Sequence, residues 1–215
     1  MSQPAHLHAA PSGLALGQVT DTQDPQGRGR VRLKLLQLDL DLWASVAVPS
    51  AGARYGVALL PKIGEVVVVG FLGGEHPVVL GALWAGDASQ PEDADPVQDR
   101  YAIATPAGTV LLMDDGEGPS LSITTPAGNS VTITDAAGGK ITASVSTTTI
   151  EVTTSEISLT ATTEVKIEAP RITLSATSVN IDAGMTSASG VVRCDTAIAT
   201  SVVGSTYTPG AGNIW

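Results

Sequence analysis

The chain has 215 residues and a formal net charge of −10, with 43% hydrophobic but only 3% aromatic residues. This length allows one or two domains, and the aromatic residues that a large core would use are concentrated between residues 43 and 84. Residues 1–86 hold equal numbers of acidic and basic residues, so residues 87–215 carry the whole negative charge, which argues against nucleic-acid binding there.

A single cysteine, Cys194, excludes a disulfide within the chain. It lies among Val, Ala and Thr residues with no histidine after it, so we expect a small core residue and not a nucleophile. The N-terminus lacks the apolar segment of a signal peptide. No apolar run approaches the ~20 residues of a membrane-spanning helix.

Residues 1–12 are expected to form a flexible arm. His6 and His8 make an H-x-H pair, but no further histidine, cysteine or carboxylate lies near them. Because zinc needs three or four such ligands, we expect no metal there.

Residues 13–86 are predicted to form a small β-barrel of five strands. The strands are expected to begin at Gly17, to cover Arg30–Leu38 and Trp43–Val48, and then to cover Glu65–Leu72 and Val78–Trp84. The run EVVVVGFL is apolar at successive positions, which predicts a central strand buried on both faces.

This segment resembles the OB-fold domain of contractile-tail spike proteins. That family includes phage baseplate assembly protein V, the VgrG spikes of type VI secretion and the spikes of extracellular injection particles. The resemblance covers about a third of the chain and depends on a combination of residues: Trp43, Ala44, Pro49, Ala51, Gly52, Pro61, Gly64, Glu65, Val68, Phe71, Gly74, Pro77 and Gly81.

Residues 87–100 are an acidic linker, too short for the lysozyme-like domain of some family members. After it, residues 104–118 and 124–138 repeat with an offset of 20, each as strand, T-P-A-G turn, strand and Asp-containing turn. A similar pattern begins the stalk in VgrG and baseplate V proteins, so the stalk is expected to begin near Tyr101.

Aliphatic residues between Ile141 and Ala183 come in pairs two positions apart, and the pairs follow each other at steps of seven or eight residues. Each pair predicts a short strand with one apolar face. We expect a trimer core made of Ile150, Val152, Ile157, Leu159, Val165, Ile167, Ile172, Leu174, Val179 and Ile181.

Such narrow strands need neighbours to bury a continuous core. The spacing between successive aliphatic pairs varies between seven and eight residues, and this variation favours an intertwined trimeric β-prism, in which three chains complete each layer. The alternatives are a monomeric β-helix and a disordered Thr/Ser-rich stalk. The fixed interval of the apolar pairs disfavours disorder.

No catalytic pattern stands out. His76 lies in a turn beside Glu75, and no nucleophile elbow, phosphate loop or CxxC motif occurs. Asp114, Asp115, Glu117 and Asp135 lack the calcium-binding nonapeptide, and an Asp in a turn commonly bonds its own backbone. The residues Glu151, Glu156, Glu164 and Glu168 are expected to form a solvated face.

Stalk residues 101–183 are followed by residues 184–215, which are expected to cap the prism or to bind a tip protein through Tyr207, Ile214 and Trp215. In the family, that partner is a small PAAR protein. Some phage spikes end in a metal-bound H-x-H tip, but no histidine follows His76 here.

The resemblance implies an all-β, non-enzymatic homotrimeric spike without cofactors. Such a spike is assembled in the bacterial cytoplasm as part of a phage tail-like particle and sits on a separate hub protein. It pierces the target membrane transiently and binds no nucleic acid. The alternatives are an OB protein that binds single-stranded nucleic acid or glycan, through Arg28, Arg30, Arg32 and Lys34 near Trp43, and an adhesin or tail-fibre fragment.

Overall fold

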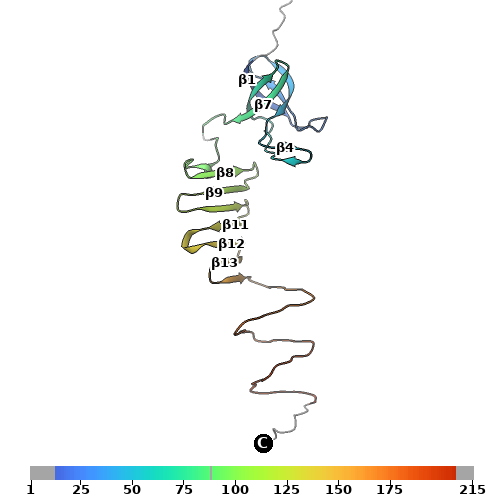
Figure 1. Ribbon diagram of the computed structural model, residues 1–215, viewed down its shortest axis with the longest axis vertical. Coiled ribbons are helices and arrows are strands. Elements are labelled where there is room, and N and C mark those ends of the chain that lie inside the picture. Colours follow the sequence, from blue (N-terminus) through green and yellow to red (C-terminus); the bar gives the residue numbers. More distant parts are fainter. Residues whose placement is uncertain (1–12, 88, 207–215) are drawn as a thin grey trace, which may run out of the picture. The chain divides into compact units, whose positions relative to one another are not determined.

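The computed structural model describes residues 13–87 and 89–206. Within them the chain is all-β, as expected: its elements are strands β1 to β14 and two single-turn 3-10 helices, η1 (Glu92–Ala94) and η2 (Ala136–Gly138). The chain divides into two units between Val165 and Lys166. The first unit contains a barrel and a separate seven-stranded sheet, which are described in turn (Figure 1).

The barrel is closed by five strands in the order β1-β2-β3-β7-β6. Their bounds are β1 (Leu14–Asp21), β2 (Val31–Leu35), β3 (Leu40–Val46), β6 (Val66–Leu72) and β7 (His76–Leu83). Neighbours are antiparallel except β3 and β7, which pair in parallel through Ser45–Val78 and Val46–Val79. A closed five-stranded barrel is the architecture of the OB fold. A short hairpin of β4 (Ala51–Gly52) and β5 (Tyr55–Gly56) lies between β3 and β6.

The barrel holds the hydrophobic core of the described chain. Alternate residues of each strand point inward, as the pattern buried-exposed-buried along β2 shows. The buried set is Val19, Val31, Leu33, Leu35, Ala44, Val67, Val69 and Val79, with Phe71 packed against it. No residue outside the barrel is a buried hydrophobic among those described.

The second strand is shorter than expected. Leu36 to Asp39 form a turn in which the Asp39 amide donates to the Leu35 carbonyl at 3.1 Å and Asp39 has a φ of 49°. The alternation of Leu with polar residues continues through this turn into β3, so the sequence pattern predicted one strand up to Leu38 where the chain already reverses.

The prediction that Glu65–Leu72 is buried on both faces is wrong. Val67 and Val69 are fully buried, but Val66 and Val68 point out of the barrel and are half-buried. A run of consecutive valines contains no alternation, so the pattern could not separate the inner from the outer face.

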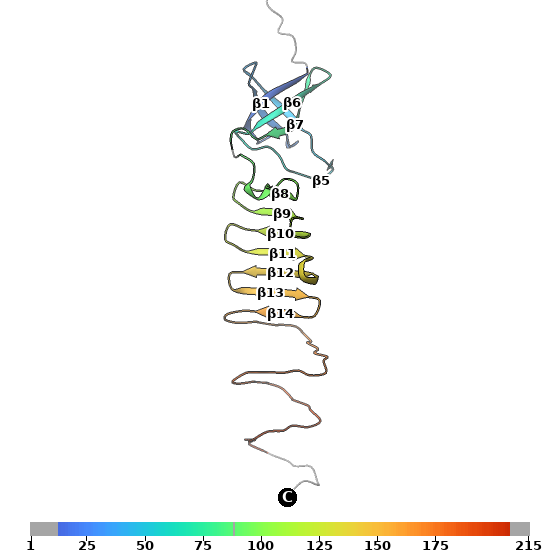
Figure 2. The ribbon, with the colours of Figure 1, turned by 90° about the vertical axis from the view of Figure 1, so that its left-hand side faces the viewer.

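The seven-stranded sheet is an antiparallel meander whose strands pair in sequence order, as Figure 2 shows. The strands are β8 (Arg100–Ala104), β9 (Val110–Asp114), β10 (Ser120–Thr124), β11 (Ser130–Thr134), β12 (Lys140–Val145), β13 (Thr148–Thr153) and β14 (Ile157–Thr160). From β8 to β12 a strand begins every ten residues, so the 20-residue repeat contains two strands and two turns.

The two T-P-A-G turns have the same backbone hydrogen bonds. Gly108 donates to the Thr105 carbonyl and Gly128 to the Thr125 carbonyl, both at 2.9 Å. Gly108 and Gly128 have φ angles of 86° and 80°, a conformation that glycine adopts without strain.

Residues 161–206 contain no strand, and all of them except Ala161 are exposed. The strands expected at Val165–Ile167, Ile172–Leu174 and Val179–Ile181 are therefore not formed within one chain. Strands β8 to β14, by contrast, pair with one another within the chain, and β8 and β14 form the two edges of the sheet.

Candidate functional site: the apolar face of the seven-stranded sheet

One face of the seven-stranded sheet is apolar. Residues directly opposite each other on antiparallel strands share a face, and the register places two such residues of every strand in line. Column one is Ile103, Leu111, Ile123, Val131, Ala143, Ile150 and Leu159. Column two is Tyr101, Met113, Leu121, Ile133, Ile141, Val152 and Ile157. We call these two columns the apolar face.

On β10 to β14 the opposite face of the sheet is polar. Its positions are serine, threonine, lysine and glutamate, and Lys140 forms an ion pair with Glu151 at 3.0 Å. On β8 and β9 the same face carries Ala102, Ala104, Val110 and Leu112. Ser130 and Ser144, which are opposite each other, share a hydrogen bond of 2.8 Å between their hydroxyl oxygens. From β10 to β14 this face is suited to water.

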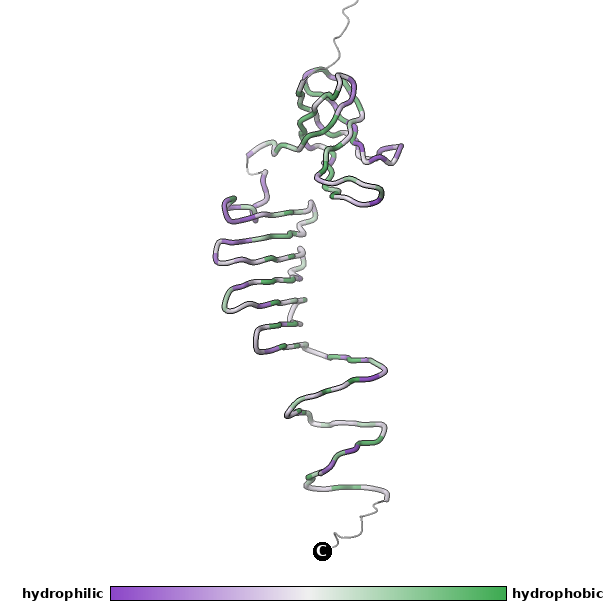
Figure 3. Tube along the Cα trace, viewed as in Figure 1, coloured by the Kyte–Doolittle hydropathy of each residue, from purple (hydrophilic) through white to green (hydrophobic). Residues whose placement is uncertain are grey.

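None of the residues of the apolar face is buried in the single chain. Ten of them are exposed, from 43% at Ile123 and Ile133 to 77% at Ile157, and the other four, Leu111, Leu121, Ala143 and Val152, are half-buried. In Figure 3 hydrophobic colour recurs on successive strands of the sheet and on the extended segment that follows β14. A contiguous apolar surface of this kind marks a site of interaction with another molecule.

The centre of the sheet also carries a shallow hollow of about 260 Å³. Its apolar lining comes from Ile123, Val131, Ala143, Val145 and Ile150 of β10 to β13. These residues leave room for inserted apolar side chains, so the hollow belongs to the same interaction surface.

The ten predicted trimer-core residues fall into two groups. Ile150, Val152, Ile157 and Leu159 lie on β13 and β14 within the apolar face. Val165, Ile167, Ile172, Leu174, Val179 and Ile181 lie in the extended segment and are 49% to 75% exposed. The proposed tip-binding residues Tyr207, Ile214 and Trp215 lie outside the described residues, as do His6 and His8.

The residues of β8 to β12 were missing from the predicted set, although the sequence contains a signal for them. The 20-residue repeat aligns Leu111 with Val131 and Met113 with Ile133, and each pair lies in one column, on β9 and β11 with β10 between them. The repeat therefore identifies the face that the spacing of aliphatic pairs found only after Ile141.

The acidic turn at the start of the sheet has a structural role. The Asp114 carboxylate accepts a hydrogen bond from the Gly116 amide at 2.9 Å and one from Arg100 Nε at 2.7 Å. Both contacts hold the pKa of Asp114 below its usual value, the backbone contact more strongly. At the equivalent turn after β11, the Thr134 hydroxyl accepts a hydrogen bond from the Ala136 amide instead.

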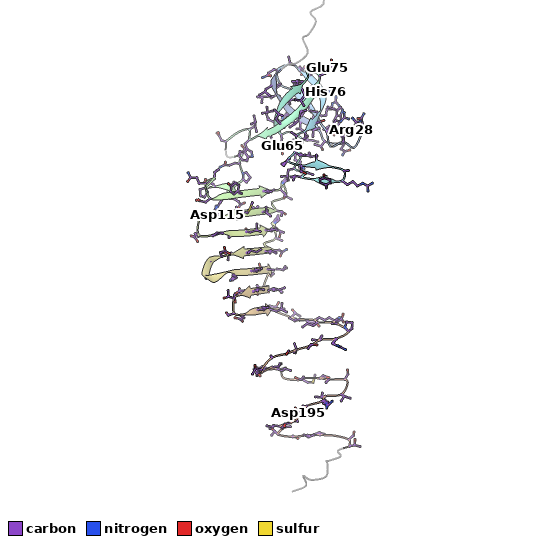
Figure 4. All side chains as sticks on the ribbon, viewed as in Figure 1. Arg28, Glu65, Glu75, His76, Asp115 and Asp195 are labelled. Carbon is purple, nitrogen blue, oxygen red and sulfur yellow. The ribbon has the colours of Figure 1, made fainter. Side chains whose placement is uncertain are left out.

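No group of His, Cys, Asp and Glu residues that could hold a metal occurs among the described residues. His76 is the only histidine in the described part of the chain and is exposed at the start of β7. Figure 4 shows it with Glu75 at the β6–β7 turn, away from Glu65 and Arg28. Cys194 is exposed in the extended segment, so the single chain does not bury it as a core residue.

The basic residues of the barrel wall are paired with acids. Arg30, Arg32 and Lys34 lie 2.8, 3.2 and 2.7 Å from Asp24, Asp41 and Asp39 respectively. Arg30 also lies over the Trp43 ring, 5.7 Å from its centroid, in a cation–π contact.

Asp24 fixes the loop between β1 and β2. Its carboxylate accepts two hydrogen bonds from the Arg30 side chain and others from the backbone amides of Gln26, Arg28 and Arg30. The Arg30 guanidinium, followed by these amides, holds the pKa of Asp24 far below its usual value. The cations of this wall therefore hold the barrel's own loops in place.

Residues 15–84, about a third of the chain, match the family model of the type VI secretion system and phage-baseplate injector OB domain. The matched region coincides with the closed barrel, so the match supports a structural role in such an injector baseplate. No curated protein matches the chain. Among the described residues, no helix is long and apolar enough to cross a membrane.

Proposed function

We propose that this chain is the central spike of a contractile injection machine and acts as a homotrimer. The observation that carries the proposal is the apolar face: two columns of apolar side chains, seven strands deep, that one chain leaves uncovered. The match of the barrel to an injector OB domain supports the assignment of this spike to a contractile injection machine.

Three copies of the sheet form a closed prism when each turns its apolar face toward a common axis. Each strand from β8 to β11 is five residues long and offers two inward side chains, so one layer of three strands encloses a thin dry interior. The polar face, with its Ser, Thr and charged residues, then lies outside in water. This arrangement buries the apolar face without adding any residue to the chain.

The segment after Thr160 supports the same assembly by a different argument. Apolar pairs recur every seven residues from Val165 to Ile181, yet residues 161–206 have no ladder partner in their own chain. Backbone amides and carbonyls are nearly always paired when apolar side chains around them are buried. Sister chains supply these partners when the three chains wind around each other.

In this proposal the barrel sits on a separate hub protein, and the prism transmits axial force and pierces the target membrane as the sheath contracts. The C-terminal end either caps the prism or carries a PAAR-like tip protein. The spike is non-enzymatic, binds no nucleic acid and is assembled in the bacterial cytoplasm within a phage tail-like particle. Pairing of Arg30, Arg32 and Lys34 with aspartates favours this reading over a groove for single-stranded nucleic acid.

Light scattering of the purified full-length chain tests the proposal. We expect three times the chain mass of 21.7 kDa, and a trimer that resists SDS because three interwound chains must separate together. A monomeric or dimeric mass would overturn it. Electron microscopy of particles labelled with an antibody against the barrel would then locate the trimer. We expect the label at the end of a sheathed tail, and a label at any other place would contradict the proposal.

A further inference from the structure

The hairpin of β4 and β5 has a fixed conformation, and the single chain leaves it uncovered. Gly52 pairs with Tyr55 across the hairpin, and Arg54 in its turn has a φ of 70°. A Cβ atom at Gly52 would overlap the Tyr55 ring, so the glycine lets the ring lie directly over the opposite strand. This ring is nevertheless 71% exposed. An aromatic side chain that is held in place but left in water is typical of an interaction surface.

The residues after the hairpin expose further apolar side chains. We call residues 50–63 the hairpin segment; Leu59 and Ile63, in its second half, are both exposed. The hairpin segment contains two basic residues, Arg54 and Lys62, and no acidic residue. Its combination of apolar and basic side chains is complementary to a surface that is apolar and acidic.

The hairpin segment and the linker to the stalk leave the same end of the barrel. Strands β3 and β7 are parallel neighbours, so their carboxyl ends lie on the same side. Strand β3 leads into the hairpin segment, and β7 leads into residues 84–99, which connect the barrel to β8. Figure 4 shows Glu65, which follows the hairpin segment, and Glu75 at opposite ends of the barrel. The hairpin segment therefore lies on the side where the chain leaves the barrel for the stalk.

The linker has the complementary chemistry. Residues 87–99 contain five acidic residues and no basic one, and Val97 among them is 67% exposed. The Asp115 amide donates to the Asp99 carbonyl at 2.9 Å, and η1 of the linker lies against β8 and β9. On these two strands the face of the sheet that is polar from β10 to β14 becomes apolar. Its residues there are Ala102, Ala104, Val110 and Leu112.

We propose that the hairpin segment of each copy docks on the linker and on this apolar part of β8 and β9 of a sister copy. The inference rests on the proposed trimer and adds a contact between barrel and stalk to it. Tyr55 and Val97 are both exposed in the single chain, so a chain does not cover its own docking surfaces. In the docked trimer, Arg54 and Lys62 of one copy face the five acidic residues of the next copy's linker.

This contact has a mechanical consequence. Within one chain, residues 84–99 alone connect the barrel to the stalk. A docked hairpin segment adds a second connection between copies, so axial load passes from barrel to stalk without bending at the linker. Because all three barrels are tethered to one stalk, each hairpin segment meets its docking surface at about millimolar effective concentration, and even a weak contact is occupied.

Crosslinking in mixed trimers of the full-length protein tests the proposal. In a Cys194→Ser background, one chain carries Ala53→Cys in the hairpin turn, and a chain with a different tag carries Gln98→Cys in the linker. Both positions are exposed, and neither substitution changes the charge. The chains are co-expressed, purified through both tags, treated with a short bismaleimide and separated on denaturing gels after boiling. In the control pair, Glu75→Cys at the opposite end of the barrel replaces Ala53→Cys.

We expect a product that joins the two tags from Ala53→Cys and none from Glu75→Cys. Addition of Arg54→Glu should slow its formation about fivefold, which corresponds to about 1 kcal/mol. Arg28→Glu changes the net charge by the same amount in the loop between β1 and β2, and it should leave the rate unchanged. Equal rates for the two charge variants would contradict the proposed docking, because its choice of partner depends on the basic residues of the hairpin segment.

Crosslinks within one chain are measured with a chain that carries both cysteines, diluted with cysteine-free chains. If light scattering finds a trimer, crosslinks only within one chain would overturn this inference and leave the proposed function intact. Absence of any crosslink, although both cysteines react with a simple maleimide, would overturn it as well. Protection of Tyr55 from hydroxyl radicals in complete particles alone would assign the hairpin segment to another protein and so contradict the inference. A monomeric protein would refute the proposed function itself.

Discussion

Truncation of one side chain at the centre of the apolar face measures how much the face contributes to assembly. Ile133 lies in column two between Leu121 and Ile141 and is 43% exposed in the single chain. The matched control is Thr132, its neighbour on the same strand, which points to the polar face between Ser122 and Thr142. We compare Ile133→Ala with Thr132→Ala.

The expected loss follows from the exposed fraction. Complete burial of an isoleucine side chain contributes about 1.5–3 kcal/mol, so burial of the remaining 43% by sister copies contributes about 0.6–1.3 kcal/mol per chain. Three chains lose about 2–4 kcal/mol, which is about a 25- to 700-fold change in the assembly constant. The cavity left in a closed core increases this loss.

Guanidinium titration followed by sedimentation velocity measures the fraction of trimer at each denaturant concentration. Ile133→Ala is expected to dissociate at a clearly lower concentration, whereas Thr132→Ala, whose hydroxyl faces water, should remain close to the unsubstituted protein. Equal shifts for the two variants would refute the reasoning, because they would mean that both faces of the sheet have the same surroundings.

Three further substitutions test the barrel, the turns and the extended segment. Asp24→Asn should lower the thermal midpoint of the barrel at pH 7. The difference between variant and unsubstituted protein should narrow as the pH falls from 3.8 toward the much lower folded-state pKa of Asp24, because in this window the carboxyl is protonated in the unfolded chain but still ionised in the folded one. A difference in calorimetry that does not vary with pH would contradict this. Gly128→Ala should lower the free energy of unfolding by about 1 kcal/mol or more, from backbone strain alone. Gly108→Ala should lower it further, because a Cβ at Gly108 would also lie 3.3 Å from Pro126. Equal denaturation midpoints for the two variants would be evidence against this. A chain ending after Thr160 should keep the thermal transition of the barrel but lose resistance to SDS on unheated gels, and unchanged resistance would show that residues 161–206 do not interlock the copies.

Alternation made part of the fold predictable from sequence. The pairs Ile150–Val152 and Ile157–Leu159 have polar residues between them, and the structure places each pair on one strand and one face. In β2 the same alternation identified the inward residues Val31, Leu33 and Leu35. Where alternation is absent, as in the valine run of β6, the sequence did not reveal that Val66 and Val68 point outward.

Other features could not be predicted because their cause lies outside the segment concerned. The end of β2 depends on Asp39 adopting a left-handed conformation, which the pattern of leucines around it conceals. The pairs at Val165–Ile167 and Val179–Ile181 have the sequence of strands, but a strand also needs a neighbour for its amides and carbonyls, and the single chain offers none. Sequence periodicity describes side chains and does not say which chain completes the ladder.

The ten-residue spacing of β8 to β12 has a consequence for how the length of the shaft can change. Neighbouring strands in a sheet are about 4.8 Å apart, so a duplicated 20-residue unit adds two strands and extends the stack by about 10 Å. The added unit leaves the chain running in its original direction and keeps the two apolar columns in line. Gain or loss of one such unit therefore changes the length of the shaft by a fixed step. The barrel and the C-terminal segment need no change in sequence.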